Sequence, residues 1–387
     1  MDLSKRVFLR AAGLLLARII LSRPLCGRGT SRKCADGCKV IVVIFGGVRD
    51  QETFSPAGRA NIPHLANDLG PQSLLYRQVR NDGVTAHFNA TSSILTGNWQ
   101  RVDDWGKLAP TSPTLFEYLR KQTAIPQSDV WVVASNKALT NLIGASSVRD
   151  YGPAYGANVV FPKQLLIAAV EHAVWQGRSR NLADRSKVQA EIESMLQDSN
   201  YEGLGWTVFE AAHHLDERAR AIIQTAVAAF VQNTGPTTGD ELTYFVSREV
   251  MRSFAPRLLV VIFSDVEVAH FGSYSMHIAG IRTADRLVHQ LWQEVTSNSE
   301  YQGRSTMVVL PEFGRDPDGS STNGFFNHRS GEDSCRTTWM MCLGEVVEKA
   351  QTVERPVRHI DLSPTLAQLL GCRMREARGE RLLEWRV

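Results

Sequence analysis

The chain has 387 residues, of which 43% are hydrophobic and 21% are charged, a composition typical of a globular protein with a large buried core. Its net charge of +3 comes from the first 33 residues, where eight Lys and Arg accompany one acidic residue; the remainder holds 35 basic and 39 acidic residues. This balance argues against a nucleic-acid-binding surface. No apolar run after the leader approaches the roughly 20 residues of a membrane-spanning helix.

The N-terminus has the architecture of an export signal. The stretch "SKRVFLRAAGLLLA" (4–17) starts with basic residues and continues into an apolar run that Arg18 interrupts. Within it, "KRVFLR" resembles the twin-arginine motif, with Lys5 in place of the first arginine. We therefore expect residues 1–33 to be a twin-arginine-like signal and the protein to be periplasmic or secreted. The alternative is an amphipathic or disordered arm on a cytoplasmic protein.

The six cysteines show no spacing typical of a zinc site. Cys34 and Cys38 are near enough in sequence to pair if the compartment is oxidising. We expect the others to be unpaired.

Four short runs rich in β-branched residues predict buried strands of a parallel sheet. Each is almost continuously apolar, as expected for strands covered by helices on both faces, and each ends in a loop with polar or acidic residues. Open parallel sheets bind ligands at this carboxyl edge. The runs are "KVIVVIF" (39–45), "DVWVVAS" (129–135), "RLLVVIF" (257–263) and "STMVVLP" (305–311).

Helical patterns separate these strands. "IPHLANDLG" (62–70) predicts a short helix that ends at Gly70. Residues 277–297 carry an apolar stripe at helical spacing. Residues 160–250 show long helical periodicity and no convincing strand, so we expect a helical insertion there.

The most specific pattern lies near the C-terminal end. "HIDLSPTLAQLLG" (359–371) predicts a helix with Ser363 as its N-cap, Pro364 at its first position and Gly371 after its last. Together with "GERLL" (379–383), it resembles the closing motif of the alkaline phosphatase superfamily. That superfamily includes sulfatases, nucleotide phosphodiesterases and cofactor-independent phosphoglycerate mutases.

Other segments resemble landmarks of that superfamily in the same order. They correspond to the first strand and its loop, the nucleophile helix, the Asp-x-x-x-His metal segment and the later Asp-His-Gly and Gly-His loops. These segments are "VIVVIFGGVRD" (40–50), "TAHFNATSSILTG" (85–97), "FSDVEVAHFGSYSMHIAG" (263–280) and "VVLPEFGRD…GFFNHRSG" (308–331). The resemblance implies a three-layer α/β sandwich with a mostly parallel central sheet and helices on both faces. It would form one domain, residues 34–387, that contains the helical insertion.

A second resemblance concerns the same loops. "GGVRDQETFSP" (46–56) and the "PEFGR…NHRSG" loops are also similar to a twin-arginine-exported, sulfatase-like family of unknown function. The chain thus combines features of both patterns.

In the superfamily, two divalent metals flank an attacking Thr, Ser or formylglycine and clamp the attacking and leaving oxygens. Carried over by position, one metal site keeps Asp265 and His270 after the third predicted strand, and His328 in the later loop. Glu267 offers a spare carboxylate. Such a set suits zinc or manganese, or calcium where carboxylates dominate. The alternative is that these side chains cap loops and bond backbone amides.

The other metal site departs from the family pattern. Gly46 stands where the first-loop Asp is expected, and Phe313 stands where a His is expected, although Glu312 keeps a carboxylate that can coordinate. Asp50 reaches the site only if its loop folds unusually. Arg49 either clamps an anion or pairs with Asp50 on the surface.

The nucleophile position departs as well. His87 aligns with the expected Thr, Ser or Cys, and Thr85 lies two residues earlier. A hydroxyl near a helix N-terminus suits attack on an anionic ester, whereas His87 suits metal ligation or acid–base work. No Cys-x-Pro-x-Arg stretch occurs near them, which argues against a formylglycine sulfatase. Arg315 and Arg329 either neutralise the transferred group or stabilise their loops.

The sequence therefore predicts an exported, divergent hydrolase of phosphate or sulfate esters that uses one divalent metal. Asp265, His270, Glu312 and His328 would hold the metal, and Thr85 or His87 would lie beside the scissile group. The substrate would be a small-molecule or polymer ester; no nucleic-acid partner and no transmembrane segment in the mature chain are expected. The alternative is a non-catalytic binding or scaffold protein on the same fold.

Overall fold

The computed structural model describes residues 37–164, 217–219, 221–223, 225–226 and 238–386. The predicted export signal, Cys26, Cys34 and most of the predicted helical insertion lie outside these residues. In the described part of the chain, no helix combines the length and apolar character needed to cross a membrane.

The described residues form a nine-stranded sheet in the order β4-β3-β5-β1-β6-β7-β2-β8, with β9 paired to β2. The strands are β1 (Lys39–Phe45), β2 (Ser73–Arg80), β3 (Val130–Ala134), β4 (Asn158–Val160), β5 (Leu258–Phe263), β6 (Ser305–Pro311), β7 (Thr337–Gly344), β8 (Gln351–Val353) and β9 (Val357–Arg358). Strands β4, β3, β5, β1 and β6 run parallel to one another, whereas β7 is antiparallel to β6 and to β2. The predicted strands are confirmed as β1, β3, β5 and β6.

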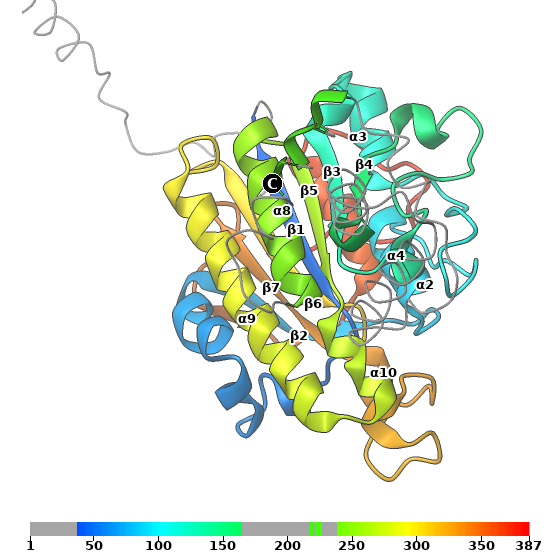
Figure 1. Cartoon of the computed structure of the whole chain (residues 1–387), viewed down its shortest axis with the longest axis vertical. Coiled ribbons are helices and arrows are strands. Elements are labelled where there is room, and N and C mark those ends of the chain that lie inside the picture. Colours follow the sequence, from blue (N-terminus) through cyan, green and yellow to red (C-terminus); the bar gives the residue numbers. More distant parts are fainter. Residues whose placement is uncertain (1–36, 165–216, 220, 224, 227–237, 387) are drawn as a thin grey trace, which may run out of the picture. The chain divides into compact units, whose positions relative to one another are not determined.

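Helices cover both faces of the sheet (Figure 1). Alternate residues of β1 point to opposite faces, so Val42 and Val43 belong to different hydrophobic clusters. Helices α2 (His87–Thr96), α3 (Leu115–Thr123) and α11 (Leu362–Leu369) pack on the first face. The π-helix η3 (His64–Leu69), α8 (Gly239–Phe254) and α9 (Tyr274–Ser297) pack on the second. Two shorter α-helices are α4 (Lys137–Thr140) and α10 (Asp333–Arg336). The predicted three-layer α/β sandwich with a mostly parallel sheet is confirmed.

The carboxyl ends of three central strands lie side by side. Phe45 at the end of β1 is level with Phe263 of β5 and with Pro311 of β6. The residues that follow these strands, including Gly46 and Glu312, therefore begin at one edge of the sheet. This register brings the predicted site loops together.

One predicted helix boundary is confirmed and one is wrong. The π-helix η3 ends at Leu69 with Gly70 as its C-cap, as expected, although Gly70 is not left-handed: with φ −49° it leads into a further 3-10 turn. The N-cap of α11 is Asp361 rather than Ser363, because a 3-10 turn over His359–Asp361 runs directly into the helix. Ser363 is the second residue of α11.

The described cysteines follow the prediction in part. Cys335, Cys342 and Cys372 are buried free thiols, as expected. Cys38 is disulfide-bonded. The partner that we predict for it, Cys34, lies outside the described residues.

The fully buried carboxylate of Glu117 anchors the start of α3. It accepts hydrogen bonds from the main-chain nitrogens of Thr114, Ser146 and Gly152 and from the Ser146 hydroxyl, at 2.6–3.1 Å. With Thr114 it also forms a capping box. This one side chain therefore ties the helix to the loop that leads to β4.

We predict that Glu117→Gln destabilises the protein by about 2–3 kcal/mol, because an amide group then faces backbone donors that need an acceptor. The urea midpoint should fall with little change in m-value. The control Glu345→Gln, at a glutamate whose side chain is 68% exposed, should change stability by less than about 0.5 kcal/mol. Equal midpoints for the two variants would contradict the prediction.

Candidate metal centre

Four side chains with metal-binding atoms converge at the carboxyl edge of the sheet: His87, Glu267, His270 and His328. One nitrogen or carboxylate oxygen from each lies within 4.8 Å of those from the others. His87 is the first residue of α2. Glu267 and His270 belong to the 3-10 helix η7 (Asp265–Phe271) after β5, and the fourth residue lies in the loop after β6. The fold thus assembles three predicted histidines with one carboxylate.

The spacing of these atoms resembles that of ligands around one metal ion. Glu267 Oε2 lies 3.1 Å from His270 Nε2 and 3.2 Å from His87 Nε2. The Nε2 atoms of His270 and His328 are 3.1 Å apart. Ligand atoms about 2.0–2.2 Å from a tetrahedral zinc ion are themselves roughly 3.3–3.6 Å apart. The four side chains therefore fit a mononuclear metal site with little rearrangement.

The surroundings of His328 decide which ring nitrogen faces the group. His328 is buried, and its Nδ1 donates to the main-chain carbonyl of Thr85 at 2.6 Å. Burial, followed by the charges of His87 and Arg315, holds the pKa of His328 well below its usual range. The imidazole is therefore neutral and presents the lone pair of Nε2, the form in which histidine binds a metal.

His87 lies between two buried carboxylates. Its Nδ1 is 2.6 Å from Glu312 Oε2, and the other oxygen of Glu312 accepts from the Thr91 hydroxyl at 2.7 Å. Burial lowers the pKa of His87, but Glu267 and Glu312 outweigh it and raise that pKa to about 10. Metal binding through Nε2 requires loss of this proton, with Glu312 left to orient the ring through Nδ1.

Glu267 is held by hydrogen-bond donors outside the group of four. Its side chain is buried, Oε1 accepts from the main-chain nitrogen of Gly47 at 2.7 Å, and Oε2 accepts from Arg315 Nη2 at 2.6 Å. Arg315 is anchored in turn by the carbonyl of Gly47 at 2.6 Å. Burial alone raises the pKa of Glu267, but Arg315 and His87 hold it well below its usual range. The carboxylate therefore stays charged and fixed in place.

Asp265 follows β5 as expected but faces the start of α8. Its Oδ2 accepts from the main-chain nitrogen of Asp240 at 3.1 Å, and Asp240 accepts from the main-chain nitrogens of Asp265 and Ser264. Burial, with the charge of Asp265 added to it, raises the pKa of Asp240 to about 8. Asp265 is not among the four converging residues, so its role as a ligand stays a prediction. The same holds for Glu312, which contacts His87.

Two residues of the first loop have partners elsewhere. Buried Arg49 forms ion pairs with Glu52 and, at 2.8 Å, with Asp318. Asp50 accepts two hydrogen bonds from Arg77 at 2.8 and 2.9 Å. Asp50 is therefore not turned toward the group of four, and Arg49 as an anion-binding residue stays a prediction.

The other predicted anion-binding residues also have partners. Arg315 bonds Glu267, and Arg329, whose side chain is 60% exposed, pairs with Asp104 at 2.7 Å. In contrast, no side chain in the described part of the chain caps α2, whose N-cap residue is Ala86. The first amides of an uncapped helix can bind an anionic group, so α2 offers such a site next to its first residue.

Glu267 is the converging residue for which the sequence gives the weakest signal. The resemblance favours Asp265, although it lies five residues before His270, one more than in the family's Asp-x-x-x-His pattern. The available signal was the Glu-x-x-His spacing of Glu267 and His270, since residues three apart lie on one face of a helical turn.

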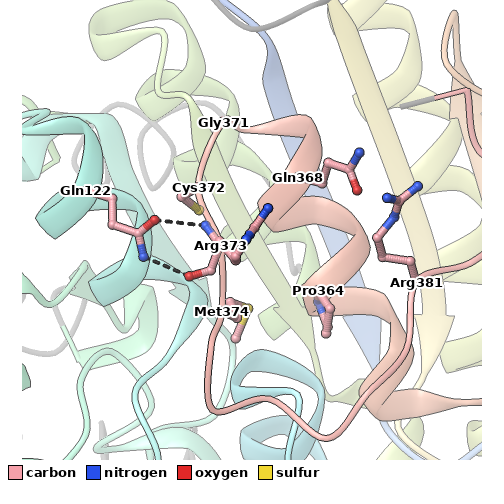
Figure 2. A pocket seen from close by; sticks show the side chains of 8 residues that line it. All are labelled: Gln122, Pro364, Gln368, Gly371, Cys372, Arg373, Met374 and Arg381. Atoms are coloured by element: carbon pink, nitrogen blue, oxygen red, sulfur yellow. Dashed lines mark hydrogen bonds between the residues drawn. The ribbon is translucent and has the colours of Figure 1, made fainter.

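A separate hollow of about 530 Å³ lies between α3 and the segment around α11 (Figure 2). Gln122 bridges it by bonding the main-chain nitrogen and carbonyl of Arg373 at 2.9 and 2.8 Å. Gln122 lies at the end of α3, which leads to the amino end of β3. The hollow contains none of the four converging residues and is distinct from their site.

No family model matches the chain, and no curated protein matches it in sequence. Its backbone resembles crystal structures instead. Wild-type alkaline phosphatase PafA superposes with a TM-score of 0.54 at 10% identity, over 93% of this chain and 100% of that chain. The lipoteichoic acid synthase LtaP from Listeria monocytogenes superposes with a TM-score of 0.52 at 12% identity, over 95% of this chain and 81% of that chain.

The chain has the alkaline-phosphatase fold. This confirms the fold that the ordered motifs predict. At such low identity the likeness concerns the fold alone, and the alkaline-phosphatase fold carries several chemistries. The function therefore depends on the side chains of the site.

We predict that His270→Ala and His328→Ala each weaken Zn²⁺ binding by more than about 100-fold, since each removes a direct ligand. Competition with a chromogenic chelator measures the affinity. The control is His289→Ala, because the described residues contain one other possible metal-binding group, His64, Asp68 and His289 on η3 and α9. This control should leave the tight site unchanged. Wild-type affinity in either site variant would exclude these histidines as ligands.

We also predict that Glu312→Gln weakens Zn²⁺ binding about tenfold and Glu312→Ala up to about 100-fold, because His87 then loses the acceptor that orients its ring. The same competition assay applies, with circular dichroism to show that both variants fold. If neither variant changes the affinity, Glu312 does not act on the metal through His87.

Proposed function

We propose that this protein is a hydrolase of phosphate or sulfate esters that uses a single divalent metal. The observation that carries the proposal is the convergence of His87, Glu267, His270 and His328 at the uncapped N-terminus of α2. Metal-binding atoms and anion-binding amides thus face the same small region. Small-molecule and polymer esters are both compatible with this arrangement.

The donor set supports zinc, with manganese as the next choice. Three imidazoles and one carboxylate suit a borderline transition metal, whereas calcium takes six to eight oxygen ligands. When bound by these residues, such a metal would supply Lewis acidity to the ester. The expected calcium option is therefore the least favoured.

The remaining steps belong to the residues of the chain. Glu312 orients His87, and Arg315 keeps Glu267 charged and in place. The amides at the start of α2 hold the oxygens of the ester. The ring of Phe313 packs on His328 with centroids 4.4 Å apart, which shields this side of the group from water.

We place Thr85 beside the scissile group, as the candidate attacking hydroxyl. It directly precedes the N-cap of α2, and its carbonyl already holds His328. His87 has both ring nitrogens engaged by carboxylates, which favours a ligand over a nucleophile. This assignment gives each of the two predicted catalytic residues a different role.

We propose further that residues 1–33 direct export and that residues 34–387 form one domain with a helical insertion at about 160–250. The disulfide at Cys38 supports an oxidising compartment. The periplasm and the extracellular space both meet this condition.

A second candidate is a non-catalytic binding protein on the same fold. It is favoured by the charge balance of the site, where His87 and Arg315 offset the carboxylates of Glu267 and Glu312 at hydrogen-bond distance. The group therefore needs no further cation for electrical balance. Metal binding and turnover separate this candidate from the hydrolase.

The test is a screen of an aryl phosphate monoester, an aryl phosphodiester and an aryl sulfate, each with added Zn²⁺, Mn²⁺ or Ca²⁺. We expect turnover of at least one ester with Zn²⁺ or Mn²⁺, a loss of at least about 100-fold in Thr85→Ala, and a similar loss in His270→Ala. The exposed variant Thr296→Ala is the matched control and should keep full activity. Silence across all esters and metals would favour the binding protein, and full activity in Thr85→Ala would remove that residue from catalysis.

A further inference from the structure

We infer that Glu267 supplies the metal-binding carboxylate that the first loop lacks, and that Gly46 is the space this carboxylate requires. The two positions then form one functional unit, divided between the segments that follow the neighbouring strands β1 and β5. The inference rests on the proposed metal site but not on ester hydrolysis.

The absence of a side chain at Gly46 leaves room for the carboxylate of Glu267. A Cβ atom built on Gly46 would lie 2.7 Å from Cδ of Glu267 and closer still to Oε1. Real Cβ atoms essentially never come within 3.0 Å of another heavy atom. The carboxylate of Glu267 therefore occupies the volume in which any side chain at position 46 would begin.

The side chain of Glu267 cannot move away from Gly46 easily. A clash with the end of a flexible side chain is relieved by movement, but Glu267 is 4% exposed and held on both oxygens. Gly47 and Arg315 donate to them at 2.7 and 2.6 Å. The backbone of η7 is also confined, because Gly280 of α9 leaves only 3.0 Å between its would-be Cβ and the nitrogen of Val266. A side chain at position 46 therefore cannot be accommodated while Glu267 keeps its place.

Position 46 and Glu267 are equivalent in where they can place a carboxylate. Strands β1 and β5 are adjacent and parallel, and Phe45 is level with Phe263. Position 46 and η7 therefore start from the same edge of the sheet. A carboxylate carbon on position 46 would lie about 1.5 Å from that Cβ, and the Cβ itself overlaps Oε1 of Glu267. Either position can thus deliver a carboxylate to the same three histidines, but both cannot do so together.

The experiment compares Gly46→Asp, Glu267→Ala and the double variant Gly46→Asp/Glu267→Ala. Zn²⁺ affinity is measured by chelator competition, the visible spectrum of bound Co²⁺ reports the ligand set, and thermal unfolding in EDTA reports the steric conflict without metal. Gly70→Asp is the control, since a Cβ there comes no nearer than 3.3 Å to another atom.

We expect Gly46→Asp to lower the melting temperature and Glu267→Ala to weaken Zn²⁺ binding by at least about 100-fold. The double variant should melt above Gly46→Asp and bind Zn²⁺ at least about tenfold more tightly than Glu267→Ala, with an intense tetrahedral Co²⁺ spectrum. Gly70→Asp should keep wild-type affinity.

Wild-type affinity in Glu267→Ala would overturn the inference, as would a double variant no better than Glu267→Ala in affinity or no more stable than Gly46→Asp. Should the substitutions at position 46 prevent folding, Glu267→Gln decides, because it keeps the shape of the side chain. Loss of affinity in this variant supports the inference, and unchanged affinity overturns it. A wild-type protein that binds Zn²⁺ but hydrolyses no ester would disprove the proposed function and leave this inference intact.

Discussion

The buried carboxylate of Glu267 ties three separate parts of the chain to one point. Its oxygens accept from Gly47 after β1 and from Arg315 after β6, while the residue itself follows β5. A buried charge costs several kcal/mol unless hydrogen bonds and an opposite charge compensate it. The loops at the ends of these strands therefore take their positions around this carboxylate, and His270 and His328 take theirs from the segments after β5 and β6.

Much of the fold follows from local sequence patterns, and the exceptions depend on contacts made far along the chain. Four strands are short, almost continuously apolar and rich in β-branched residues, which predicts their burial on both faces. They are β1, β3, β5 and β6. Strand β2 instead carries partly exposed residues such as Arg77, and β7 is rich in Met, Thr and Trp, so neither was predicted. Ser363, the expected N-cap, instead donates its hydroxyl to the main-chain carbonyl of Ile94. This contact is far away in sequence, so local capping patterns could not predict it.

The site also combines residues that local sequence patterns predict with one that depends on distant contacts. The motifs identified His87, His270 and His328, which converge because the strand order places their loops at one edge. The position of Glu267 depends on the absence of a side chain at Gly46, and sequence spacing does not contain such a spatial relation. The resemblance marks Gly46 as a loss, whereas the structure shows that the space is filled by the carboxylate of Glu267 from η7, which follows the neighbouring strand β5.

The place of β1 at the centre of the sheet also bears on how the protein is made. Val40 pairs with Leu258 on one side and with Thr306 on the other, and both partners are synthesised long after it. A nascent chain thus carries an apolar strand with two unpaired edges, the kind of segment that readily pairs with other chains. Such non-local pairing also slows folding. The proposed metal site is completed later still, since His328 lies beyond both partner strands, and β1 keeps unpaired edges until those strands are made.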